Sequence, residues 1–142
     1  MMGGWKPRQS DLRRAVSTAY YALFHALCRN CADALIGTVG ANRSEPAWRQ
    51  AYRSVNHGQA RDRFRNGTVM AKFPADIQDF GNAFLDAQRK RHAADYDPSW
   101  RAAKAVVLTD IGSAEAAIGK LRSASMKHRR ALAAWVTLVD RK

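Results

Sequence analysis

The apolar residues of this chain recur at three- and four-residue steps, and no segment alternates with period two for long enough to predict a strand. We therefore expect helices over 11–35, 46–64, 74–92, 98–122 and 126–139. Glycine and polar clusters separate these ranges, so the expected connections are short. The pattern predicts an all-α fold, a bundle of four to five helices with short connections.

Capping residues and helix breakers set the expected ends of these helices. Ser10 suits the N-cap of the first helix, and Asp97 suits the N-cap of a helix that begins at Pro98. Gly37 and Gly40 are expected to end the first helix, because glycine adopts the backbone conformation that follows many helix C-termini.

The 142 residues suit one ordinary domain over 1–142, and an apolar fraction of 46% suits a globular protein. Its expected parts are a lead-in at 1–9, the helical body and a short C-terminal helix within 123–142. No apolar run approaches the length of a membrane span, and the N-terminus lacks the apolar stretch of a secretory signal. We therefore expect a cytoplasmic protein without membrane contact.

Cys28 and Cys31 are the only cysteines, and they form a C-x-x-C pair within the first predicted helix. A zinc site would need two further ligands, and a thioredoxin-like motif would need a different setting. We therefore expect reduced, buried or half-buried cysteines, no metal and no cofactor.

Several aromatic and basic side chains are expected to have structural positions. His25 lies within the apolar first helix and is expected as a core histidine, for which a tyrosine is a suitable partner. Arg13 and Arg14 are expected as surface residues or ligand contacts. The tryptophans are expected as core or interface anchors rather than as stacking platforms for bases: Trp5, Trp48, Trp100 and Trp135.

Charge is the strongest global signal. Lys and Arg number 24 against 12 Asp and Glu, which gives a formal net charge of +12. A surplus of this size favours the binding of polyanions and speeds encounters with them. The basic residues are concentrated in 49–72 and 120–142. Nucleic acid is therefore a candidate partner, while a basic surface that serves only solubility is the alternative.

One candidate nucleic-acid-binding set lies on the predicted helix 46–64. Arg53, His57 and Arg61 lie at four-residue steps, so a continuous helix would place them on one face together. Arg49 precedes them, and a histidine between arginines suits a phosphate contact with a lowered pKa. The alternative is a solvated basic face.

The stretch 73–100 begins as an apolar helix face and ends in charge. The residues that share the apolar face are Phe73, Ile77, Phe80 and Phe84. The charged end supplies the candidate catalytic residues Arg89, Arg91, His92, Asp95 and Tyr96. Two alternatives stay open: an exposed helix end with an Arg91–Asp95 ion pair, and a structural contact that ties this helix to the first one.

Two segments resemble members of the HEPN superfamily (higher eukaryotes and prokaryotes nucleotide-binding). DLRRAVSTAYYALFHAL at 11–27 resembles the opening helix of these proteins, and RHAADYDP at 91–98 resembles the Arg-x-x-Ala-Asp-Tyr signature of one bacterial branch. The segments lie in the expected order, and the likeness covers 8–122. The resemblance implies a HEPN-like four- to five-helix up-and-down bundle that forms a homodimer and binds RNA or nucleotide.

The resemblance also implies a choice of activities. Many members are metal-independent endoribonucleases of the toxin or defence type, and others are non-catalytic modules that bind nucleotide or a protein partner, such as an antitoxin or a nucleotidyltransferase. The active branch carries an arginine, four to six residues, and then a histidine. Placing Tyr96 on the family's terminal tyrosine puts Arg89 on that arginine and Ala94 where the histidine is expected. This departure bears on the activity more than on the fold.

Cleavage of RNA without a metal requires a base for the 2′-hydroxyl proton, an acid for the leaving 5′-oxygen and a cation for the phosphate. Histidine suits the first two tasks and arginine suits the third. In this chain Arg91 is the candidate phosphate ligand, His92 the candidate base or acid, and Tyr96 a candidate donor or stacking surface.

Overall fold

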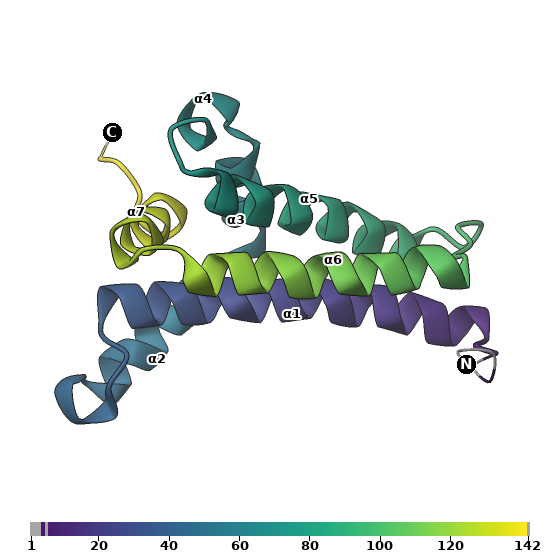
Figure 1. The fold of residues 1–142 in the computed structure, drawn as a ribbon, viewed down its shortest axis with the longest axis horizontal. Coiled ribbons are helices and arrows are strands. Elements are labelled where there is room, and N and C mark those ends of the chain that lie inside the picture. The colour runs from purple at the N-terminus through teal and green to yellow at the C-terminus, as the bar shows by residue number, and fades with distance from the viewer. Residues whose placement is uncertain (1–3, 5, 142) are drawn as a thin grey trace.

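The structure, a computed structural model, describes residues 4 and 6–141, and within them every regular element is a helix (Figure 1). The long helices are α1 (Gln9–Leu35), α5 (Ala75–Tyr96) and α6 (Lys104–Ser123). The shorter elements are η2 (Gly40–Asn42), α2 (Glu45–Arg53), α3 (His57–Arg65), α4 (Gly67–Met70) and α7 (Met126–Thr137). The predicted all-α class is confirmed. Residues 1–3 and 5 of the predicted lead-in, Trp5 among them, lie outside the described residues.

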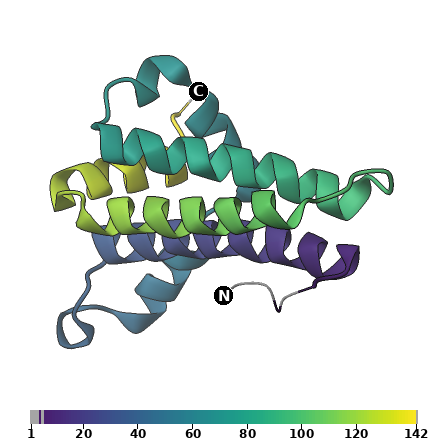
Figure 2. The same ribbon diagram turned by 45° about the vertical axis from the view of Figure 1, so that its right-hand side comes forward.

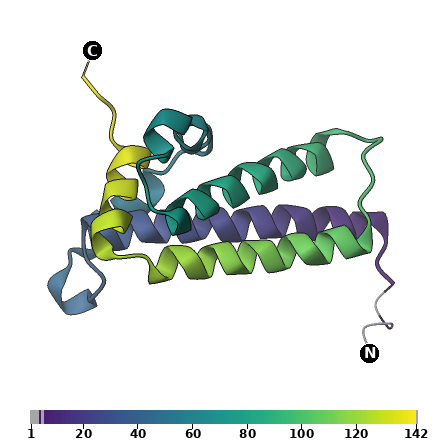
Figure 3. The ribbon, with the colours of Figure 1, turned by 45° about the horizontal axis from the view of Figure 1, so that its top comes forward.

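The long helices lie side by side and form the body of the molecule (Figures 2 and 3). α5 runs opposite to α1, since Arg13 near the start of α1 donates to the carbonyl of Ala94 near the end of α5. Lys90 pairs with Asp110, and Lys120 with Asp79, so α6 also runs opposite to α5. α7 crosses the end of this body, and the short helices gather at the same end (Figure 1).

The core follows the apolar faces expected from the sequence. Fully buried side chains of α1 and α5 meet there: Tyr20, Leu23, Leu27, Ile77, Phe80 and Phe84. Leu121 from α6 and Leu132 from α7 join the same cluster, so one core connects the body with the crossing helix. Burial of a large apolar side chain stabilises a fold by roughly 1.5–3 kcal/mol, so these contacts determine how the helices sit.

The predicted helix over 46–64 is wrong, because α2 ends at Arg53 and α3 begins at His57. The side chain of Asn56 accepts a hydrogen bond of 3.0 Å from the Gln59 N–H and caps the new helix. Val55 is buried between the two helices, with 6% of its surface exposed. Arg53, His57 and Arg61 therefore do not share one continuous helix face.

The predicted helix start at Pro98 is also wrong, since α6 begins at Lys104. Oδ1 of Asp97 accepts from the backbone N–H of Ser99 at 3.0 Å and from its hydroxyl at 2.7 Å, which makes a turn rather than a helix N-cap. Ser10 does not cap α1 either, because that helix begins at Gln9. Gly37 follows the end of α1 with φ +138°, a conformation that favours glycine.

Arg13 closes the end of α5. Its guanidinium donates to the carbonyl oxygens of Ala94 at 2.6 Å and Asp97 at 3.1 Å, and also to that of Trp100. The last carbonyls of a helix have no partner within the helix, so an arginine from α1 satisfies them. The guanidinium of Arg13 is therefore engaged by carbonyl groups of its own chain. The neighbouring Arg14 is exposed.

Trp48, Trp100 and Trp135 all serve as anchors, and the ring of Trp48 also lines a cavity described below. The indole N–H of Trp48 donates to Asp33 at 2.9 Å, and that of Trp135 donates to the carbonyl of Arg63 at 3.1 Å. Trp100 packs against a second, smaller cluster near the start of α1. Each ring thus fixes a short element or connection to the body.

Arg13→Lys should destabilise the protein, because one ammonium group cannot serve several carbonyl oxygens in the geometry of a guanidinium. Carbonyls left without a partner cost about 1–3 kcal/mol, so we expect a loss of that order in urea unfolding. The matched control is Arg14→Lys on the exposed side of the same turn, which should leave the unfolding midpoint unchanged. Equal midpoints for both variants would contradict the role of Arg13.

Gly81→Ala should destabilise the contact of α3 with α5. A Cβ atom at this position would lie 2.7 Å from Cδ1 of Phe64 and 3.3 Å from Cε of Met70. Overpacking of a core costs about 1–3 kcal/mol, measured by urea unfolding. Gly112→Ala is the control, since nothing lies within 4 Å of its Cβ and alanine favours a helix interior. It should stabilise the protein, and a loss at Gly112 like that at Gly81 would contradict the packing argument.

Candidate functional site

A group of polar and aromatic side chains meets where α5 lies against the middle of α1 and the start of α3. We call it the Arg91 cluster, and its members are Ser17, Tyr20, Tyr21, Phe24, His57, Gln88, Arg91 and Asp95. α1, α3 and α5 each contribute to it. Residues far apart in the sequence are brought together here by the packing of these helices.

Arg91 is held from two sides. Its Nη2 donates to the hydroxyl of Tyr21 at 3.0 Å, and its guanidinium carbon lies 5.3 Å from the centre of the Tyr21 ring. Its Nε lies 2.9 Å from Oδ2 of Asp95, as an ion pair rather than an aligned hydrogen bond. Oδ1 of Asp95 accepts from the hydroxyl of Ser17 at 2.9 Å. The expected Arg91–Asp95 pair is present within α5, and its hydrogen bonds to Tyr21 and Ser17 tie α5 to α1.

His57 occupies the other side of the cluster. Its Nδ1 lies 2.6 Å from the hydroxyl of Tyr20, and its ring stacks on Phe24 with 3.7 Å between ring centres. The side-chain amide of Gln88 donates to the Tyr20 hydroxyl at 3.2 Å and to the His57 carbonyl at 3.3 Å. The first residue of α3 is thus fixed against both long helices.

The environment sets the protonation states of these groups. Burial lowers the pKa of His57, and the nearby charge of Arg91 lowers it further. Burial raises the pKa of Tyr20 to about 12. At neutral pH the pair therefore consists of a neutral imidazole and a protonated phenol beside a guanidinium. A neutral imidazole can accept a proton, and a guanidinium can hold a phosphate.

The other candidate catalytic residues lie elsewhere on α5. His92 is exposed, and its ring lies 4.8 Å from that of Tyr96, which has 66% of its surface exposed. Arg89 is exposed and pairs with Asp86 at 2.6 Å. Only Arg91 and Asp95 of the predicted catalytic set belong to the Arg91 cluster. The histidine that joins them is His57, which the sequence placed in the nucleic-acid-binding set.

Sequence spacing gave no signal for this meeting of His57 and Arg91. The two residues belong to different helices, and the break that frees His57 from α2 depends on the asparagine cap at Asn56. Asn followed by His-Gly is a signal for such a helix start, and it is the one feature of the sequence that marks the break.

A second feature is a cavity of about 590 Å³ between α1, α2 and the end of α6. We call it the arginine pocket. It is lined by Ala22, His25, Ala26, Arg29, Trp48, Arg49, Tyr52, Arg53 and Arg122, with no carboxylate among them. The candidate residues Arg49 and Arg53 therefore share one site, while Arg61 lies apart and pairs with Asp62 at 3.2 Å.

His25 lies in this pocket and has the tyrosine partner expected for it. Its Nδ1 is 2.7 Å from the hydroxyl of Tyr52. It is exposed, however, so the expectation of a core histidine is wrong. His25 therefore lies on the face of α1 that is turned toward α2 and not on the face that packs in the core.

The cysteines are buried, as expected, with 2% of Cys28 and none of Cys31 exposed. Burial raises the pKa of both thiols to about 12, so neither is a reactive thiolate at neutral pH. Within residues 4 and 6–141, no cluster of three or more His, Cys, Asp or Glu side chains suits a metal ion. In the same residues no helix is long and apolar enough to cross a membrane.

The lowered pKa of His57 predicts a pH dependence of stability. The unfolded chain takes up a proton at this position near pH 6.5, whereas the folded protein takes it up only at lower pH. Stability from His57 is therefore present above about pH 6.5 and lost as the pH falls toward the folded pKa. Thermal unfolding of the wild type and of His57→Gln between pH 7.5 and about pH 5 should show a smaller loss in the variant. Parallel pH profiles would contradict this assignment.

Comparison of the chain with models of protein families, with curated proteins and with solved structures returned no match in any of the three.

Proposed function

We propose that this chain is a HEPN-like RNA-binding protein and that the Arg91 cluster cleaves RNA without a metal ion. The observation that carries the proposal is that the neutral imidazole of His57 and the guanidinium of Arg91 lie in one cluster with two tyrosine hydroxyls. These groups match the base, cation and proton donor that metal-free cleavage requires.

The proposed reaction uses the 2′-hydroxyl of RNA as the nucleophile. When Nδ1–H of His57 donates to Tyr20, Nε2 carries a free lone pair and takes the 2′-hydroxyl proton. The 2′-oxygen then bonds to phosphorus while Arg91 holds the charge of the pentacovalent phosphate. The bond from phosphorus to the 5′-oxygen breaks, and that oxygen takes the proton of the Tyr21 hydroxyl. The products are a 2′,3′-cyclic phosphate and a 5′-hydroxyl. His57 then releases its extra proton to solvent, and solvent restores the proton of Tyr21.

The charge of the chain supports RNA as the ligand. A net charge of +12 favours polyanions, and the arginine pocket lies next to the Arg91 cluster through the rings of His25 and Tyr21, whose centres are 6.4 Å apart. The 2′-hydroxyl distinguishes RNA from DNA in the proposed reaction, because only RNA carries the nucleophile.

A non-catalytic HEPN module that binds nucleotide or a protein partner, such as an antitoxin or nucleotidyltransferase, is the second candidate function. The observation that favours it is the position of His92, whose ring lies against that of Tyr96 and not beside Arg91. The histidine of α5 is thus absent from the Arg91 cluster. A cytoplasmic homodimer is part of both proposals, since the resemblance implies face-to-face pairing. Sedimentation equilibrium at several concentrations tests the dimer.

We expect the pure protein to cleave end-labelled RNA in the presence of EDTA, with the products described above. His57→Ala should reduce the rate by about 10²–10⁴, the usual contribution of a general base. Arg91→Ala should reduce it by about 10²–10³. His92→Ala is the matched control on the exposed side of α5 and should retain the wild-type rate. Unfolding curves of each variant separate a lost reaction from a lost fold.

Binding without cleavage would remove the enzyme from the proposal and leave the non-catalytic module. Loss of activity in His92→Ala with full activity in His57→Ala would contradict the assignment of the base. RNA with a single 2′-deoxy substitution at the cleaved position should bind but remain intact. Binding that ignores the salt concentration would contradict phosphate contacts altogether.

A further inference from the structure

We infer that the arginine pocket binds the 5′-polyphosphate group of a nucleotide, either a free nucleoside polyphosphate or the 5′-triphosphate end of an RNA. This site is separate from the Arg91 cluster, so the inference holds whether or not that cluster cleaves RNA. Three features of the pocket support it: the charge around the cavity, the rings in its wall and the bonds that hold the wall in place.

The charge around the pocket is unbalanced. Its arginines come from three helices, with Arg29 on α1, Arg49 and Arg53 on α2, and Arg122 on α6. Among the described residues, Arg49, Arg53 and Arg122 form no ion pair, and Arg29 reaches only Asp33 at 4.0 Å. Like charges around one cavity repel each other, and a bound anion removes that cost.

The number of these cations points to a ligand with several negative charges. One phosphodiester carries a single charge, which matches one guanidinium. A chain of two or three phosphates carries enough charge, and enough oxygens, to reach arginines on both walls of the pocket at once. The volume of about 590 Å³ is within the range of pockets that hold small molecules of nucleotide size.

Aromatic rings form the other part of the lining. The ring centres of Trp48 and Tyr52 are 5.4 Å apart, and Tyr52 stacks on His25 with 21° between the ring planes. Rings of this kind stack with nucleobases of any identity. A ligand with phosphates and a base would therefore use both parts of the lining, whereas inorganic polyphosphate would use only the arginines.

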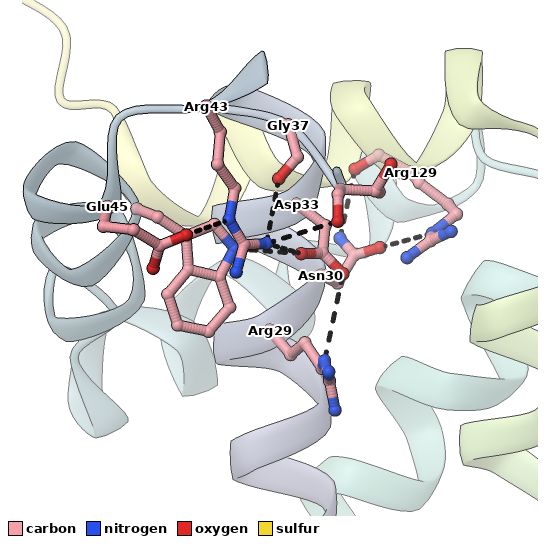
Figure 4. A network of polar contacts seen from close by, with 9 residues as sticks. Arg29, Asn30, Asp33, Gly37, Arg43, Glu45 and Arg129 are labelled. Carbon is pink, nitrogen blue, oxygen red and sulfur yellow. Dashed lines mark hydrogen bonds and ion pairs between the residues drawn. The ribbon is translucent and has the colours of Figure 1, made fainter. Parts of the chain in front are cut away.

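The wall of α2 is fixed by a polar network at the end of α1 (Figure 4). Asp33 accepts from the indole of Trp48 at 2.9 Å and pairs with Arg43 at 3.6 Å. Arg43 also bonds Glu45 at 2.8 Å and donates to the carbonyl of Gly37 at 3.3 Å. The guanidinium of Arg43 lies 4.5 Å from the centre of the Trp48 ring. Asp33 and Glu45 are thus engaged in holding the wall, and of the pocket's arginines only Arg29 pairs with either of them, at 4.0 Å.

Isothermal titration calorimetry with AMP, ADP, ATP and inorganic tripolyphosphate tests the inference. We expect affinity to rise with each phosphate from AMP to ATP, and ATP to bind more tightly than tripolyphosphate. A second arm compares one short RNA with a 5′-triphosphate and with a 5′-hydroxyl. Tighter binding of the triphosphate form without binding of free ATP identifies an RNA end as the source, and tight binding of ATP identifies a free nucleotide.

The variant Arg49→Gln/Arg53→Gln should weaken the binding of ATP or of 5′-triphosphate RNA by about tenfold or more, because it removes two of the guanidinium groups that would bind the phosphates. Both side chains are exposed, so the fold should remain. Arg65→Gln/Arg101→Gln removes the same charge at exposed positions outside the pocket and should leave affinity unchanged. Arg122→Gln gives an independent test from α6. Equal losses for the two double variants, or affinities independent of phosphate number, would overturn the inference.

Discussion

The hydroxyl group of Tyr20 is the constraint on which the fold and the proposed site both depend. This side chain is completely buried, and its ring centre lies 5.3 Å from that of Phe84. A buried phenol without hydrogen-bond partners is costly, so its own chain must supply them. Gln88 on α5 and His57 on α3 do so. The start of α3 is thereby held against the long helices, and a histidine stands beside Arg91 as a consequence.

The surroundings of Tyr20 and His57 also determine the protonation states of the site. Burial keeps the proton on Tyr20 and keeps His57 neutral, and the charge of Arg91 strengthens the second effect. Asp95 and Ser17 hold Arg91 in place from the opposite side, so its orientation does not depend on a ligand. The structural contact and the candidate catalytic site, which were alternatives at the level of sequence, are thus made by the same residues. A site built from side chains that already hold the fold is preorganised for its reaction.

The sequence predicted what depends on local spacing and missed what depends on long-range packing. The apolar faces of α1 and α5, their approximate ends and the Arg91–Asp95 pair all follow from steps of three and four residues. The helix break before His57 was missed because the asparagine cap at Asn56 outweighed a continuous polar helix pattern. The role of Arg13 was missed because its acceptors are carbonyls more than 80 residues away, which leave no trace in side-chain spacing. The meeting of His57 and Arg91 was missed for the same reason, because it depends on the packing of α3 against α5 and not on spacing along the chain.

In the proposed reaction His57 and Arg91 act on one phosphate, and a double-mutant cycle on the cleavage rate tests this most directly. The rates of His57→Ala, Arg91→Ala and the double variant are compared with the wild type, on the same RNA and without metal. Residues that serve one transition state are strongly non-additive, so the double variant should be little slower than the slower single variant. Independent effects that multiply in the double variant would contradict a shared site.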